Sequence, residues 1–73
     1  MSTLKKKVTD LVPGDQFKVN DIFVVDRFES HDGIQGILYR VLDGSNLGWF
    51  SVAEIRDLGE YWNELTQTWT KFS

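Results

Sequence analysis

His31 is the only histidine in the chain and the first candidate for acid–base or metal chemistry. It stands in the run Ser30-His31-Asp32-Gly33. A catalytic triad needs a nucleophile, a histidine and an acid that converge in space, and immediate neighbours in sequence rarely do so. A zinc site would have to be completed by carboxylates, because the chain contains no cysteine. We therefore expect His31 to be an exposed loop residue without a catalytic or metal-binding role.

Two carboxylate pairs, Asp10 with Asp15 and Asp57 with Glu60, come closest to the paired acids of a glycosidase or a metal site. Such chemistry needs carboxylates that converge in a cleft. Most acids of this chain stand at expected turns or helix ends, where local hydrogen bonds account for them. The glycines are too scattered for a phosphate-binding loop. The sequence therefore predicts a protein that is not an enzyme and that has no cofactor and no metal site.

The length and composition favour a small soluble domain. At 73 residues the chain has room for one domain. The absence of cysteine excludes disulfides and fits a reducing cytoplasm. No apolar run approaches the ~20 residues needed to cross a bilayer, and no apolar segment of a secretory signal follows the first lysines. We expect a cytoplasmic protein without membrane contact.

Charge is divided between a basic start and an acidic remainder. Lys5, Lys6 and Lys7 contribute three positive charges, whereas residues 8–73 contain five cations and eleven carboxylates, so that 5 − 11 = −6. We expect a flexible basic tip over residues 1–7 and one acidic domain after it. An acidic domain favours a partner protein with a basic surface. Nucleic-acid binding through the three lysines is the alternative, and so few charges supply only a weak, salt-sensitive contact.

Alternating apolar residues predict a series of antiparallel strands. The expected strands cover residues 16–20, 22–28, 34–42 and 47–50. Pro13-Gly14 and Asp32-Gly33 are strong turn signals, and Asn20-Asp21 is expected to form a two-residue hairpin turn. Gly36 interrupts the third strand, where a glycine is typical of a bulge or a sharp bend.

A short helix is predicted over residues 52–58. Ser51 and Glu54 have the spacing of a capping box, and Gly59 stands where a glycine cap belongs. Residues 61–72 are less regular, with strand-favouring segments at each end. The predicted core consists of Leu11, Phe17, Val19, Ile22, Val24, Val25, Ile37, Tyr39, Val41, Phe50, Ile55 and Leu58.

The aromatic content is high, with three Trp, two Tyr and five Phe. Most of these rings are expected to fill a thin β core. A domain of this size cannot readily bury every tryptophan, and Trp and Tyr are enriched at the centres of protein interfaces. We therefore predict a partner-binding surface around the helix, formed by Trp49, Tyr61, Trp62, Glu54, Asp57 and Glu60.

The segment V-P-G-D-Q-F-K-V followed by I-F-V-V-D-R resembles the opening of small SH3-like barrel proteins of bacteria and their phages. The resemblance implies a mainly β fold: a small SH3-like barrel, or a strongly bent antiparallel sheet, of about five strands with one short helix. Short acidic proteins of this type also resemble phage accessory proteins that bind and modify a host protein. We thus expect a protein-binding module, with a nucleic-acid-associated barrel and a small homo-oligomeric structural protein as alternatives.

Overall fold

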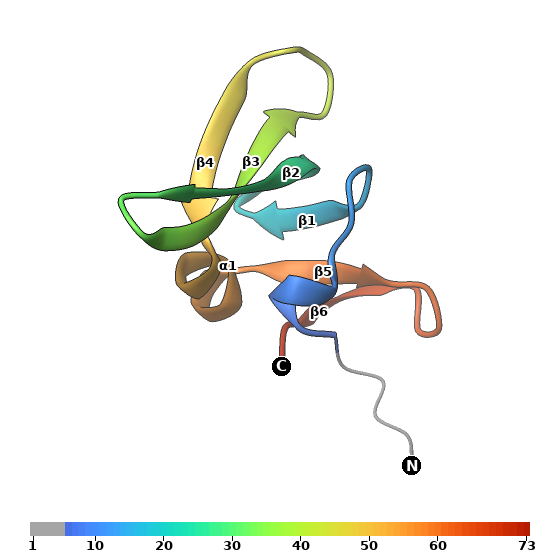
Figure 1. Ribbon diagram of the computed structural model, residues 1–73. Coiled ribbons are helices and arrows are strands. Elements are labelled where there is room, and N and C mark those ends of the chain that lie inside the picture. Colours follow the sequence, from blue (N-terminus) through green and yellow to red (C-terminus); the bar gives the residue numbers. More distant parts are fainter. Residues whose placement is uncertain (1–5) are drawn as a thin grey trace.

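The computed structural model describes residues 6–73, which form a single six-stranded antiparallel sheet with one α-helix (Figure 1). The elements in chain order are η1 (Val8–Asp10), β1 (Gln16–Val19), β2 (Asp21–His31), β3 (Ile34–Val41), β4 (Leu47–Ser51), α1 (Val52–Leu58), β5 (Glu60–Asn63) and β6 (Thr68–Lys71). The strands are ordered β4-β3-β2-β1-β5-β6 across the sheet. The mainly β prediction is confirmed. The predicted count of about five strands is wrong by one, because the irregular C-terminal segment folds into a complete hairpin, β5–β6.

Residues with positive φ stand at the turns of the chain. Gly14, at φ 96°, follows Pro13 in the predicted turn, and Asp32 and Gly33, at φ 53° and 81°, join β2 to β3. Asn20, at φ 67°, is the single residue between β1 and β2, because Val19 and Asp21 on either side of it are already paired in register. The predicted two-residue turn is therefore one residue too long.

The sheet is strongly bent. Two strands lie between β1 and β4, so that in a flat sheet these strands would be about 14 Å apart. The rings of Phe17 on β1 and Phe50 on β4 nevertheless lie 6.3 Å apart between centroids. One cause is a bulge in β2, where the register with β3 shifts between Val25 and Arg27.

Gly36 does not lie at a bulge. It lies in regular register with Glu29 on one side and Ser51 on the other. A Cβ at this position would lie 2.3 Å from the Trp49 ring and 2.5 Å from the Phe50 carbonyl oxygen. The glycine is needed for close packing, and the regular register shows that the bulge suggested at this position is wrong. A sharp bend at Gly36 stays a prediction.

The core lies on the inner face of the bent sheet, where Phe17 and Ile37 are completely buried and α1 contributes Ile55. Its buried cluster consists of Val8, Leu11, Phe17, Val19, Val25, Ile37, Ile55, Tyr61 and Phe72. Val24 is buried outside this cluster. Among the predicted core residues, Leu58 is wrong, since it is 63% exposed at the end of α1. Ile22 and Val41 are only partly buried and lie outside the cluster.

Helix α1 begins and ends as the sequence predicts. The Glu54 amide donates to the Ser51 hydroxyl at 3.0 Å, and the Ser51 amide donates to the Glu54 carboxylate at 2.9 Å. Gly59 closes the helix with an extended backbone, φ −101°, and not with the left-handed conformation of a glycine cap. A Cβ there would lie 2.6 Å from the Ile55 carbonyl oxygen, so crowding explains the glycine. No helix within residues 6–73 is long and apolar enough to span a membrane.

Candidate functional site

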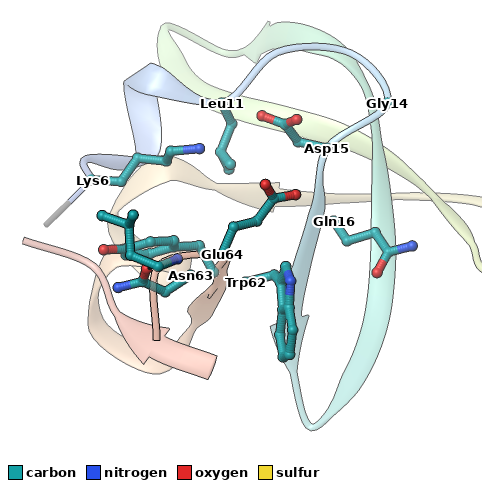
Figure 2. Close-up of a pocket in the computed structure, with 10 residues that line it drawn as sticks. Lys6, Leu11, Gly14, Asp15, Gln16, Trp62, Asn63 and Glu64 are labelled. Atoms are coloured by element: carbon teal, nitrogen blue, oxygen red, sulfur yellow. The ribbon is translucent and has the colours of Figure 1, made fainter. Parts of the chain in front are cut away.

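A groove opens where β1 and β5 separate. These strands are in register for two residue pairs only, Phe17 with Tyr61 and Lys18 with Glu60. Beyond them, the start of β1 and the end of β5 diverge, and a cavity of about 570 Å³ lies between them (Figure 2). We call it the β1–β5 groove. Its lining residues are Lys6, Leu11, Gly14, Asp15, Gln16, Tyr61, Trp62, Asn63, Glu64 and Leu65.

The groove combines a rigid apolar floor with exposed apolar walls. Leu11 and Tyr61 are each only 3% exposed and belong to the core. Trp62 is 41% exposed and packs edge-on against Trp69 of β6, with 5.5 Å between ring centroids. Leu65 is 74% exposed. Exposed apolar area next to a fixed floor is the usual arrangement of a protein contact site.

The β5–β6 turn is held by Asn63, the one buried polar side chain among residues 6–73. Its side-chain oxygen accepts hydrogen bonds from the amides of Leu65 at 3.0 Å and Thr66 at 3.4 Å. Its carbonyl oxygen accepts from the Gln67 amide at 2.6 Å. These bonds fix the turn, and so they fix Glu64 and Leu65 beside the groove.

Three charged side chains line the groove. Asp15 accepts the Val12 amide on one carboxylate oxygen, at 3.0 Å. The Lys6 ammonium lies 5.7 Å from the centroid of the Tyr61 ring. Glu64 is exposed and makes no hydrogen bond or ion pair with any other described residue. Figure 2 shows the Glu64 carboxylate directed between Asp15 and the Trp62 indole.

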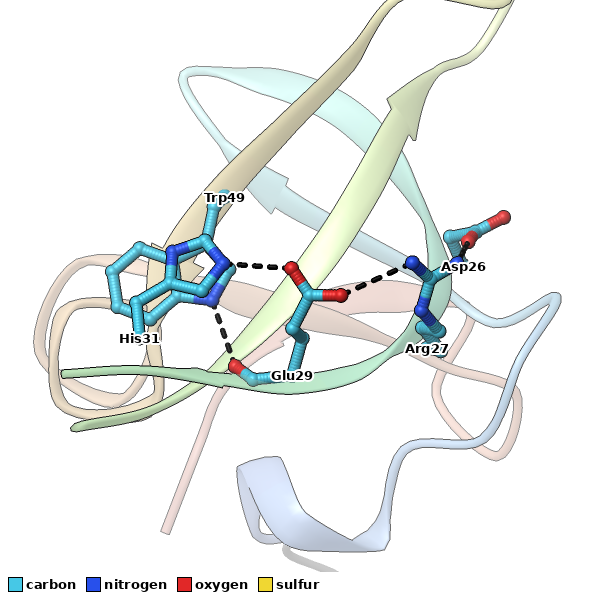
Figure 3. Close-up of polar contacts among 5 residues, drawn as sticks. All are labelled: Asp26, Arg27, Glu29, His31 and Trp49. Carbon is cyan, nitrogen blue, oxygen red and sulfur yellow. Dashed lines mark hydrogen bonds and ion pairs between the residues drawn. The ribbon is translucent and has the colours of Figure 1, made fainter. Parts of the chain in front are cut away.

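Trp49, one of the residues predicted to bind a partner, packs against the β2–β3 hairpin (Figure 3). Its indole N–H donates to the Glu29 carbonyl oxygen at 2.8 Å. Its ring stacks on His31 at 4.4 Å between centroids, with 17° between the planes. Gly36 leaves the space for the ring, as described above. Trp49 and Trp62 thus contact different parts of the sheet and do not share the groove.

His31 is exposed, as predicted, but it is the last residue of β2, so its predicted position in a loop is wrong. Its Nε2 lies 2.7 Å from the Glu29 carboxylate, which also accepts from Arg27 at 3.1 Å. Arg27 in turn donates to Asp26 at 3.0 Å (Figure 3). The hydrogen bond with His31 is the main reason why the pKa of Glu29 lies below its ordinary value of 4.5. The hydrogen bond with Arg27 and the positive charge of Arg27 lower the pKa further.

The predicted acidic residues do not converge. Glu54 is part of the helix cap. Asp57 is exposed, with its carboxylate 3.7 Å from Arg56 and its carbonyl oxygen accepting from Lys71 at 3.2 Å. Glu60 lies in register between Lys18 of β1 and Lys71 of β6. Only Tyr61 and Trp62 of the predicted set therefore line the groove.

Of the predicted lysines, Lys6 lines the groove, and its carbonyl oxygen accepts from the Ser73 amide at 3.0 Å. The Lys7 amide donates to the Asp10 carboxylate at 3.0 Å and so caps η1. Lys5 lies outside the described residues. The flexible tip over residues 1–7 stays a prediction.

The strand register places cations on the outer face of the sheet. Glu60 of β5 is in register with Lys18 of β1 on one side and with Lys71 of β6 on the other. The side chains of both lysines and of Glu60 therefore lie on the face of the sheet opposite to the core. Arg27 and Arg40 are on the same face, in register with Leu38 and Leu47. The Lys18 ammonium lies 5.8 Å from the centroid of the Trp69 ring.

No group of three or more His, Cys, Asp or Glu within residues 6–73 is placed to hold a metal ion. Comparison of the chain with protein-family models, with curated proteins and with solved structures gave no match. The functional argument therefore depends on the geometry of the chain itself.

Proposed function

We propose that this protein is a non-enzymatic protein-binding module whose contact surface is the β1–β5 groove. The observation that carries the proposal is the position of Trp62, half-exposed beside a groove with a buried floor. Trp at the centre of a contact brings a large rigid area at little entropic cost. The packing of Trp62 against Trp69 holds the ring before any partner arrives.

The proposed fold is an SH3-like barrel with an additional C-terminal strand. The supporting features are the bend that brings Phe17 and Phe50 into contact, the bulge in β2, and the helix that precedes β5. The resemblance to phage accessory proteins makes a bacterial host protein with a basic surface the partner to test first.

The proposal is tested by capture from a bacterial lysate with tagged protein, followed by mass spectrometry. We expect one stoichiometric partner, bound at least about 30-fold more weakly by Trp62→Ala, since interface centres contribute ~2 kcal/mol or more. Leu58→Ala is the matched control, because Leu58 is also an exposed apolar residue but lies on α1. Equal loss in both variants, or no loss in Trp62→Ala, contradicts the proposal.

Nucleic-acid binding is a second candidate, supported by Lys18 over the Trp69 ring and by the cations of the outer face. Aromatic rings flanked by cations are suited to stacking of single-stranded bases. A fluorescently labelled single-stranded oligonucleotide tests it by anisotropy at two salt concentrations. Binding that weakens with salt and is lost in Lys18→Gln supports this candidate.

Homo-oligomerisation is the third alternative. The sheet is open, so β4 and β6 are its edges, and an exposed edge strand pairs readily with another chain. Sedimentation velocity over a concentration series distinguishes it: a monomer throughout excludes this alternative.

A further inference from the structure

Within the proposed protein-binding function, on which this inference rests, the groove itself indicates what kind of side chain it takes. We infer that the β1–β5 groove binds an arginine side chain of the partner, with the guanidinium between the Glu64 and Asp15 carboxylates and against the Trp62 indole.

The first argument is the unused acceptor capacity of the groove. Glu64 has no hydrogen-bonding or ion-pair partner among residues 6–73, and Asp15 uses one carboxylate oxygen for the Val12 amide. Lys6 does not compensate them, since no ion pair within 4.0 Å joins it to either acid. The groove therefore presents two carboxylates to an incoming donor.

The second argument is the combination of these acids with aromatic rings. A guanidinium is planar and weakly hydrated, so it stacks on an indole while it donates to carboxylates. Lys6 shows within this molecule that a cation is held in the groove at an aromatic face, 5.7 Å from the Tyr61 centroid. Trp62, at the other side of the groove, has no cation over its ring within the described chain.

The third argument is the rigidity of the acceptor. Glu64 directly follows Asn63, whose side chain and carbonyl oxygen fix the β5–β6 turn through three hydrogen bonds. Asp15 is fixed by its bond to Val12 and by its carbonyl oxygen, which accepts from the Val25 amide at 2.8 Å. The backbone at both walls is thus positioned before binding, so that only the Glu64 side chain has to be ordered by the contact, which lowers its entropic cost.

The test is an NMR titration of the full chain, labelled with ¹⁵N, with N-acetyl-arginine N-methylamide. N-acetyl-citrulline N-methylamide is the matched probe, because it keeps the shape and removes the charge. We expect arginine to bind about fivefold more tightly than citrulline. The shifts should concentrate at the Trp62 indole N–H and at the amides of Asp15 and Glu64. The lysine analogue should fall between the two probes, because it is cationic but not planar.

Variants complete the test. Glu64→Gln should reduce arginine binding toward the citrulline level, with Asp15 left as the remaining carboxylate, whereas Asp57→Asn removes an equal charge from α1 and should leave it unchanged. Equal binding of arginine and citrulline, or an equal effect of both variants, overturns the inference. If this occurs while Trp62→Ala still loses the captured partner, the proposed function stands and only the arginine assignment fails. If Trp62→Ala keeps the partner, the proposed function itself fails.

Discussion

Gly36→Ala should destabilise the fold by about 2 kcal/mol, because the added Cβ has no space. It would lie 2.3 Å from two atoms of the Trp49 ring and 2.5 Å from the Phe50 carbonyl oxygen. Overpacking of this kind costs about 1–3 kcal/mol. Displacing the ring also weakens its bond to the Glu29 carbonyl oxygen, about 1 kcal/mol. Alanine loses less conformational entropy on folding than glycine does, and this difference offsets about 0.5–1 kcal/mol of the destabilisation.

This effect is large for so short a chain. A protein of 73 residues has a total stability of roughly 4–11 kcal/mol. Urea unfolding followed by circular dichroism should show a midpoint lowered by about 1–2 M. Gly44→Ala is the control, since a Cβ there meets only the Val41 Cγ2 methyl, at 3.0 Å. Equal midpoints for the two variants would refute the packing role of Gly36.

A double variant separates the ring from the backbone as the source of the clash. In a Trp49→Leu background the added Cβ of Gly36→Ala no longer meets the indole. The cost of the alanine should therefore fall by about 1 kcal/mol relative to its cost in the wild type. An unchanged cost would assign the clash to the Phe50 carbonyl oxygen alone.

Four further substitutions test other parts of the structure. Ser51→Ala should lower the free energy of unfolding by about 1 kcal/mol in urea melts, because it removes the side-chain cap of α1. The pKa of Glu29 is lowered by its bond with His31, so its contribution to stability is complete above pH 4.5 and is lost as the pH falls through the lowered value. Glu29→Gln should therefore be less stable than wild type near neutral pH, and the difference should shrink in melts at about pH 3. With a basic partner, Glu64→Gln should slow association and Lys18→Gln should speed it, both by about twofold at low salt in surface plasmon resonance.

Local patterns predicted most of the secondary structure. Three predictions depend only on residues close in sequence, and the structure confirms all three. They are the alternation of Phe17 and Val19, the Asp32-Gly33 turn and the Ser51–Glu54 capping box. The register of β1 with β2 is shifted by one, because Asn20 alone spans a turn for which the sequence suggested two residues.

Long-range packing was harder to foresee. Leu58 continues the apolar period of α1, yet as the last residue of the helix it is 63% exposed. Val8, Tyr61 and Phe72 are buried where the segment that begins at Lys6 meets the C-terminal residues, since the Ser73 amide donates to the Lys6 carbonyl oxygen and Phe72 packs on Tyr61 at 5.3 Å between centroids. Nothing in the local sequence indicates that meeting.

The candidate site also depends on contacts between residues that are distant in sequence, which local patterns do not predict. The sequence predicted that at least one tryptophan is exposed, but Trp49 and Trp62 both flank α1 in sequence and could not be told apart. The strand order separates them, because it places Trp49 beside the β2–β3 hairpin and Trp62 beside the β1–β5 groove. The groove arises because the ladder between β1 and β5 stops after two pairs. Asp15 and Glu64 are 49 positions apart in sequence, 64 − 15 = 49, so no local signal could have indicated that they line the same groove.

The strand register also changes what the net charge means for a partner. The value of −6 over residues 8–73 suggests a uniformly acidic surface. Alternation along the strands instead places Lys18, Arg40 and Lys71 on the outer face of the sheet, whereas Asp15 and Glu64 stand at turns beside the groove. Charges further apart than about 10 Å are screened from each other at moderate salt. A basic partner is therefore attracted more by Asp15 and Glu64 at the groove than by the outer face, where Glu60 stands between Lys18 and Lys71, so the charge pattern favours one docking orientation even though the chain as a whole is acidic.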